Sequence, residues 1–136
     1  MNRMFLATLA GAATAAVLAV LIFGLALGPF FAANVGSATG VSKDPPALVW
    51  VLLARLPLAL MLALAISKWG DSTSLAGGAR VGAIFGFLVT SGFDLTTYGF
   101  TNVSNLPATL LGIIVSTAVF AMEGAVIGSV LGRGSE

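Results

Sequence analysis

The sequence predicts an all-α fold, a bundle of four transmembrane helices in an up-down arrangement with both termini in the cytoplasm. Of the 136 residues, 58% are hydrophobic and 8% are charged, whereas a soluble domain carries about 25% charged residues. The apolar residues gather in four segments, each close to the length of about 20 residues that a helix needs to cross a bilayer. We expect helices at about residues 4–27, 47–67, 78–100 and 106–131, in a single transmembrane domain that covers residues 1–136.

The composition excludes several kinds of chemistry. The chain has no cysteine and no histidine, which removes disulfides, thiol nucleophiles, Cys/His zinc sites and imidazole acid–base catalysis. The net charge is +1 and no run of basic residues is present, so we expect no nucleic-acid partner. An enzyme would have to rely on carboxylates, serines, threonines and one tyrosine. We therefore expect no catalytic residues and no metal site, and the composition identifies no cofactor.

The first apolar segment, residues 4–27, is expected to be a retained membrane span. As a helix it would be about 36 Å long, enough to cross a hydrocarbon core of about 30 Å. The alternative is a secretory signal peptide, whose apolar region is only about 7 to 15 residues long. Small residues recur at every fourth position and form a ridge along this helix: Ala7, Gly11, Ala15 and Ala19.

The next part of the chain is a connection followed by the second span. Gly28 and Pro29 are expected to end the first helix. Residues 30–46 form the longest connection and are polar enough to lie in water. In the second helix, residues 47–67, Pro57 removes a backbone donor, so we expect a kink about one turn before it. Tryptophans, which are typical of the membrane–water interface, stand near both ends of this helix: Trp50 and Trp69.

Small residues recur at every fourth position of the third helix, where they form a smooth face. This stripe consists of Gly78, Gly82, Gly86 and Thr90, and the next position on the same face is Asp94. Another helix can approach such a face closely. The fourth helix repeats the spacing at Gly124, Gly128 and Gly132. Packing within the chain is the favoured interpretation of these stripes, and a dimer face is the alternative.

The charges at the ends of the spans predict the orientation. Four spans put both termini on one side of the membrane, and that side carries four basic residues: Arg3, Lys68, Arg80 and Arg133. The other side carries Lys43 alone. Because basic residues are enriched in cytoplasmic loops, we expect both termini in the cytoplasm and residues 30–46 on the outer side.

Three ionisable residues fall inside the predicted spans: Arg55, Asp94 and Glu123. Each ionised side chain costs on the order of 3 kcal/mol at the bilayer centre, so we expect these residues to face the interior and to pair. Arg55 and Asp94 lie about 12 Å and 10 Å from the outer side, which predicts a polar tie between them. Glu123 lies nearer the inner end of its helix, which predicts a tie to Arg80, or to Lys68 reaching back from its turn.

The predicted ties have two interpretations. In the first, they only fix the register and orientation of the helices. In the second, Asp94 and the neighbouring hydroxyl side chains line a route for a proton or a substrate. Threonine hydrogen bonds in helical bundles are worth well under 2 kcal/mol on average, so a threonine-lined face alone is weak support for a route.

The chain resembles a family of small, uncharacterised four-helix bacterial membrane proteins in four segments: FFAANVGSATGV, SKWGDSTSLAGGARVGAIFGF, FDLTTYGFTNVSNLP and AVIGSVLG. The resemblance covers nearly the whole chain and is clearest over residues 30–131. Its most specific parts are FGF, FDLTTYG and the glycine spacings. The resemblance implies a four-helix fold in the bacterial cytoplasmic (inner) membrane. It implies no catalytic or binding residue, because the family has no assigned activity.

We expect a non-enzymatic integral membrane protein, an accessory or structural subunit that packs against the helices of other subunits or of its own copies. The size of the chain, its small-residue faces and the lack of a catalytic set favour this function. The alternative is a small oligomeric transporter or channel that uses Asp94 or Glu123, and a dimer would be needed to enclose its path. The expected surroundings in either case are a lipid bilayer.

Overall fold

The computed structural model describes residues 2–69 and 72–133. In these residues the chain is helical, and four stretches are long and apolar enough to cross a membrane: Asn2–Ala26, Leu48–Lys68, Leu75–Phe100 and Leu106–Gly132. Each end lies within three residues of the predicted end. The all-helical fold with four membrane-length helices is therefore confirmed.

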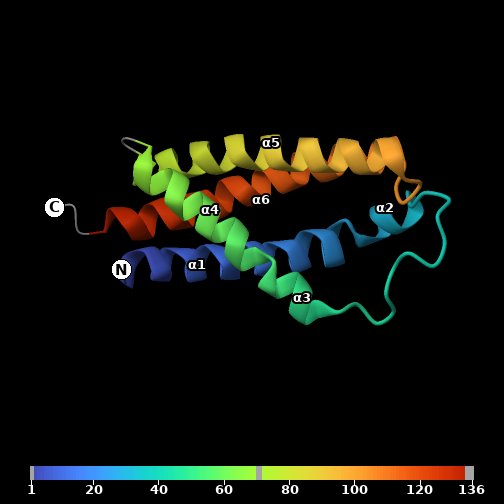
Figure 1. Cartoon of the computed structure of the whole chain (residues 1–136), viewed down its shortest axis with the longest axis horizontal. Coiled ribbons are helices and arrows are strands. Elements are labelled where there is room, and N and C mark those ends of the chain that lie inside the picture. The colour runs from blue at the N-terminus through green and yellow to red at the C-terminus, as the bar shows by residue number, and fades with distance from the viewer. Residues whose placement is uncertain (1, 70–71, 134–136) are drawn as a thin grey trace.

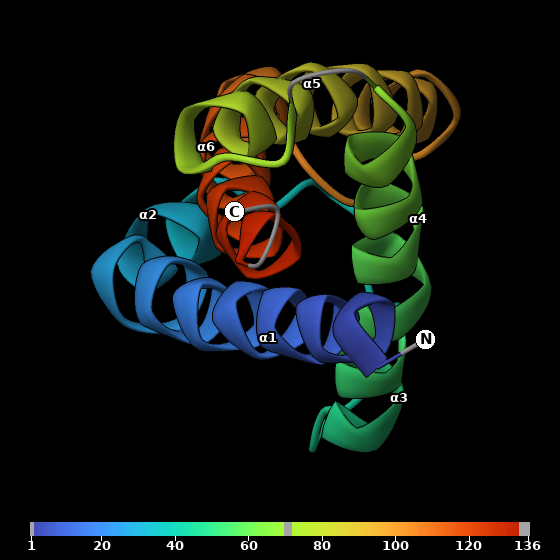
Figure 2. The same cartoon turned by 90° about the vertical axis from the view of Figure 1, so that its left-hand side faces the viewer.

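The last helix, α6 (Leu106–Gly132), lies between the other long helices. Viewed from the end of the bundle, α1 (Asn2–Ala19) and α5 (Leu75–Phe100) lie on opposite sides of α6, and α4 (Arg55–Lys68) covers a third side (Figure 2). In the side view α3 (Leu48–Leu53) and α4 cross the bundle obliquely (Figure 1). The start of α1 and the end of α6 lie at one end of the bundle, and α2 (Gly28–Ala33) lies at the other (Figure 1).

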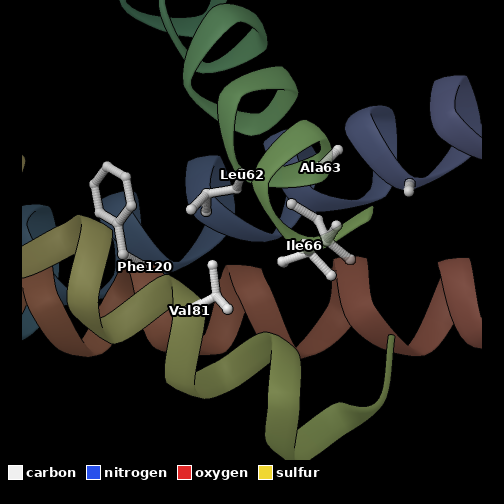
Figure 3. Packing of buried hydrophobic residues seen from close by; sticks show 7 residues of the cluster. Leu62, Ala63, Ile66, Val81 and Phe120 are labelled. Carbon is white, nitrogen blue, oxygen red and sulfur yellow. The ribbon is translucent and has the colours of Figure 1, made fainter. Parts of the chain in front are cut away.

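The core is small and lies where α1, α4, α5 and α6 meet. Figure 3 shows Leu62, Ala63 and Ile66 of α4 packed towards Val81 of α5 and Phe120 of α6. In an apolar 18-residue window of each membrane-length stretch, only 17% to 33% of the residues are buried, and most large apolar side chains point outward. A protein surrounded by water rarely exposes so much contiguous apolar surface. The distribution fits helices whose outer faces contact hydrocarbon.

The first span ends differently from the prediction. After α1 the chain continues as a π-helix, Val20–Ala26, in which the Leu27 N–H donates to the Ile22 carbonyl at 2.7 Å. The first span thus ends just before Gly28 and Pro29, as predicted, but these two residues also begin α2, which the sequence did not predict. Pro29 fits the first turn of α2 because an N–H at that position has no partner within the helix.

The second span is interrupted about one turn before Pro57, where the sequence predicts a kink. Helix α3 ends at Leu53 and α4 begins at Arg55, with Ala54 between them. Pro57 has no N–H to donate to the Leu53 carbonyl, and its ring would clash with that carbonyl in a continuous helix. The break therefore places Arg55 in the first turn of α4, beside the hinge.

Side-chain caps fix the starts of the last two long helices. The Ser74 hydroxyl accepts a hydrogen bond from the Gly77 N–H at 3.0 Å, so α5 begins at Leu75, three residues before the predicted start. The Asn105 side chain accepts from the Ala108 N–H at 3.1 Å and caps α6. Pro107 occupies the first turn of α6, as its fixed φ favours.

Candidate functional site

The two glycine stripes pack against each other within the chain. A Cβ added to Gly82 would lie 2.1 Å from the Phe120 carbonyl oxygen. A Cβ added to Gly128 would lie 2.3 Å from the Ser74 carbonyl oxygen. Gly78, Gly86 and Gly124 make similar contacts between the two helices. The close packing of α5 on α6 thus occupies the glycine faces of both helices.

The stripe on α5 ends in polar side chains at the opposite end of the bundle from the chain termini. The Thr90 hydroxyl donates to the Gly86 carbonyl in its own helix, at 2.6 Å. One turn later, Oδ2 of Asp94 lies 3.8 Å from the position of a Cβ on Gly112, and the Phe31 ring lies 4.0 Å from the same position. Asp94 therefore faces α6 near α2.

Helix α2 and the chain after it are tied to the turn between α5 and α6. The Gly36 N–H donates to the Val103 carbonyl at 3.1 Å, and the Ala38 N–H donates to the Asn102 carbonyl at 3.0 Å. The side-chain amides of two asparagines also meet, with Asn105 donating to Asn34 at 2.9 Å. We call these paired segments, residues 34–38 and 102–105, the outer cap. Neither segment has a periodic pattern, so no signal in the sequence indicated that they pair.

Arg55 and Asp94 line one cleft of about 530 Å³ between α4, α5 and α6. Thr90 and Ser116 add hydroxyl groups to its wall, and the other lining side chains are apolar: Val51, Ala54, Leu58, Val89, Phe93 and Phe120. The common depth predicted for Arg55 and Asp94 agrees with this shared cleft. However, no hydrogen bond or ion pair joins the two side chains in the described residues, so the predicted tie is not formed.

Glu123 is the most unusual side chain of the bundle. It is 1% exposed, and neither carboxylate oxygen has a hydrogen-bond partner in the described residues. Its Cγ lies 3.4 Å from the position of a Cβ on Gly11 of α1. The sequence identified Glu123 as an intramembrane charge but predicted a basic partner for it, Arg80 or Lys68.

The predicted tie between Glu123 and Arg80 is wrong. Arg80 is exposed, and the Glu123 oxygens accept no hydrogen bond from it. A helix turns about 100° per residue, so position 80 points away from the face of Gly78 that packs on α6. Lys68, the other predicted partner, is also exposed. The glycine stripe already indicates that Arg80 cannot reach Glu123, because Arg80 does not lie on the face of α5 that carries the glycines and packs on α6.

Three helices thus contribute one charged side chain each to the interior: Arg55 from α4, Asp94 from α5 and Glu123 from α6. Arg55 forms no hydrogen bond or ion pair with either carboxyl group in the described residues. No group of three His, Cys, Asp or Glu side chains within the described part of the chain could hold a metal ion.

No family model, curated protein or solved structure matches this chain. The resemblance to small bacterial four-helix proteins therefore stays a prediction. The four long apolar helices indicate a multi-pass membrane protein. Its distinctive chemical feature is the cleft that Arg55 and Asp94 line, with Glu123 buried on the neighbouring helix.

Proposed function

We propose that the chain is a non-enzymatic integral membrane protein that packs against other membrane-spanning helices, as an accessory subunit of a larger membrane complex. The observation that carries this proposal is the position of α3. All six of its residues are between 47% and 72% exposed, and it has no buried residue. The first six of the 21 residues of the second span therefore stand away from the helices of the same chain (Figure 1).

The surroundings of α3 support a protein partner. A cleft of about 440 Å³ separates α3 from α1, and its α1 side is made of Leu9 and three alanines, Ala12, Ala13 and Ala16. Small residues let a second helix approach closely, and close packing is the main force between helices in a bilayer. The glycine faces of α5 and α6 are already used within the chain. The groove between α1 and α3 is thus a packing surface that the chain itself leaves free.

Photo-crosslinking in native membranes tests this proposal. A photoreactive side chain at position 49, in α3, should form adducts with another membrane protein. The matched control is position 114 on α6, because Val49 and Ile114 are 67% and 66% exposed. Position 114 should give lipid adducts only. Equal adduct patterns from both positions, or a mild-detergent purification that yields this chain alone, would contradict the proposal.

The proposed location is the bacterial cytoplasmic membrane, with up-down spans and both termini in the cytoplasm. Support comes from the basic residues, of which Arg3, Lys68, Arg80 and Arg133 belong to one side and Lys43 to the other. The chain has no cysteine, so single cysteines can report the sidedness directly. A membrane-impermeant maleimide should label S42C in intact cells and should label S72C only after the membrane is opened. The reverse pattern would invert the orientation.

A second candidate function is a small oligomeric transporter or channel that uses Asp94 or Glu123. The cleft with Arg55, Asp94, Thr90 and Ser116 favours it, because ionisable residues in membrane spans often mark transport routes. D94N should abolish flux of protons, cations or small metabolites into liposomes. The matched control, D44N, changes an exposed loop residue and should leave the flux unchanged. Wild-type protein without any such flux would exclude this function.

A further inference from the structure

The interior charges of the bundle do not balance. The interior of the bundle holds two carboxyl groups, Asp94 of α5 and Glu123 of α6, and one guanidinium, that of Arg55 of α4; Arg55 and Asp94 line one cleft, and Glu123 is buried on the neighbouring helix. With both acids ionised, this group carries a net charge of −1. An unbalanced charge costs several kcal/mol or more in a medium of low dielectric constant. One further positive charge would make the group neutral.

No other side chain of the described protein supplies that charge. Helix α1 has no ionisable residue after Arg3, and the atoms of Glu123 face Gly11 there. On α4 the only other cation, Lys68, is exposed in the last turn. On α5 Arg80 is exposed on the far face, and α6 holds no ionisable residue besides Glu123. The described chain therefore leaves this group one positive charge short.

The two acids differ in their surroundings. Asp94 is only partly buried and lines a cleft whose wall also carries Arg55 and the hydroxyl groups of Thr90 and Ser116. Glu123 is 1% exposed and both of its oxygens lack hydrogen-bond partners in the described residues. Burial without hydrogen bonds disfavours the ionised form of a carboxyl group. The extra positive charge therefore belongs on Glu123.

We propose that Glu123 is a proton-binding site, which holds one proton on its carboxyl group while Arg55 serves as the counter-ion of Asp94 across the cleft. The carboxylate takes the proton from water and forms a neutral acid, and no other bond changes. Loss of that proton would leave Arg55 to neutralise two carboxylates. A metal ion is the weaker occupant because hard cations take about six oxygen ligands, and the described residues offer no three-acid cluster.

The full chain permits a test that leaves Glu123 unchanged. It contains two glutamates, Glu123 and Glu136. Labelling glutamate with ¹³C at the side-chain carboxyl carbon therefore gives two signals in lipid nanodiscs, and the carbon shift distinguishes the acid from the carboxylate. At neutral pH we expect one acid signal and one carboxylate signal. E136Q should remove the carboxylate signal and leave the acid signal in place.

Each other outcome would overturn the proposal. Two carboxylate signals at neutral pH would show that Glu123 is ionised. Loss of the acid signal in E136Q would show that the protonated glutamate is Glu136 and not Glu123. Exchange of potassium for sodium at constant pH should change nothing, and a carboxylate signal that replaces the acid signal in sodium would identify a metal-ion site.

Discussion

Gly78 of α5 and Gly124 of α6 contact each other through their backbones. A Cβ on Gly78 would lie 2.1 Å from the Gly124 carbonyl oxygen, and a Cβ on Gly124 would lie 2.2 Å from the Gly78 carbonyl oxygen. The requirement for glycine here is steric, because both residues are helical and neither has a positive φ. The two helices can lie this close only if neither position carries a side chain.

Alanine at Gly78 should therefore loosen the pairing of α5 with α6. Because the added methyl would meet backbone atoms, which cannot rotate away, G78A should cost about 1–3 kcal/mol of stability, as overpacking does elsewhere. The matched control is G92A in the same helix, where a Cβ meets nothing within 4 Å. That change should be neutral or stabilising by up to about 1 kcal/mol. Thermal unfolding in detergent compares the two, and equal effects would contradict the packing.

The outer cap makes a separate prediction at Gly36. A Cβ on Gly36 would lie 1.9 Å from the Asn102 carbonyl oxygen, so G36A should separate residues 34–38 from residues 102–105. Loss of a hydrogen bond worth about 0.5–1.5 kcal/mol should speed exchange of the Ala38 amide hydrogen by roughly two- to tenfold. S37A changes an exposed neighbour and should leave the exchange rate unaltered. Unchanged exchange in G36A would argue against the pairing.

The two arginines of the membrane-length helices should differ in their effect on stability. R55Q removes the cation that acts on Glu123 and lines the cleft with Asp94, so it should cost about 1–3 kcal/mol by leaving buried polar groups without compensation. R80Q changes an exposed side chain and should stay within about 0.5 kcal/mol of the wild type. Denaturant titration of both variants checks that R55Q is the more destabilising change. A larger loss of stability in R80Q would support the tie between Glu123 and Arg80 that the sequence predicted.

The break at Ala54 should depend on Pro57. P57A restores an N–H that can donate to the Leu53 carbonyl, so α3 should align with α4 and change its distance from α5. Spin labels at positions 50 and 88 report this distance, since Trp50 and Leu88 are 72% and 62% exposed. Labels at positions 60 and 88 form the control, because position 60 lies in α4 beyond the proline. If the distance between positions 50 and 88 does not change in P57A, the break at Ala54 is caused by the packing of the surrounding helices and not by Pro57.

The sequence alone was sufficient to predict the features that depend on residues close together along the chain. Apolar runs predicted the four membrane-length helices, because a segment must satisfy its own backbone in hydrocarbon. Pro57 predicted the break, since a missing N–H acts within one turn. The sequence also singled out Arg55, Asp94 and Glu123, because charges in such spans are costly wherever they point. It missed α2, where Gly28 and Pro29 fit the start of a helix as well as an end.

The tertiary structure alone decided which of these residues meet. It placed Arg55 and Asp94 in one cleft, buried Glu123, left Arg80 exposed, and paired residues 34–38 with residues 102–105. A position along a helix fixes the height of a side chain, but its partner also depends on the crossing of the helices. That crossing follows from the glycine contacts of α5 with α6 and from the oblique course of α4 (Figure 1). Contacts between distant segments arise from such packing, which no local pattern encodes.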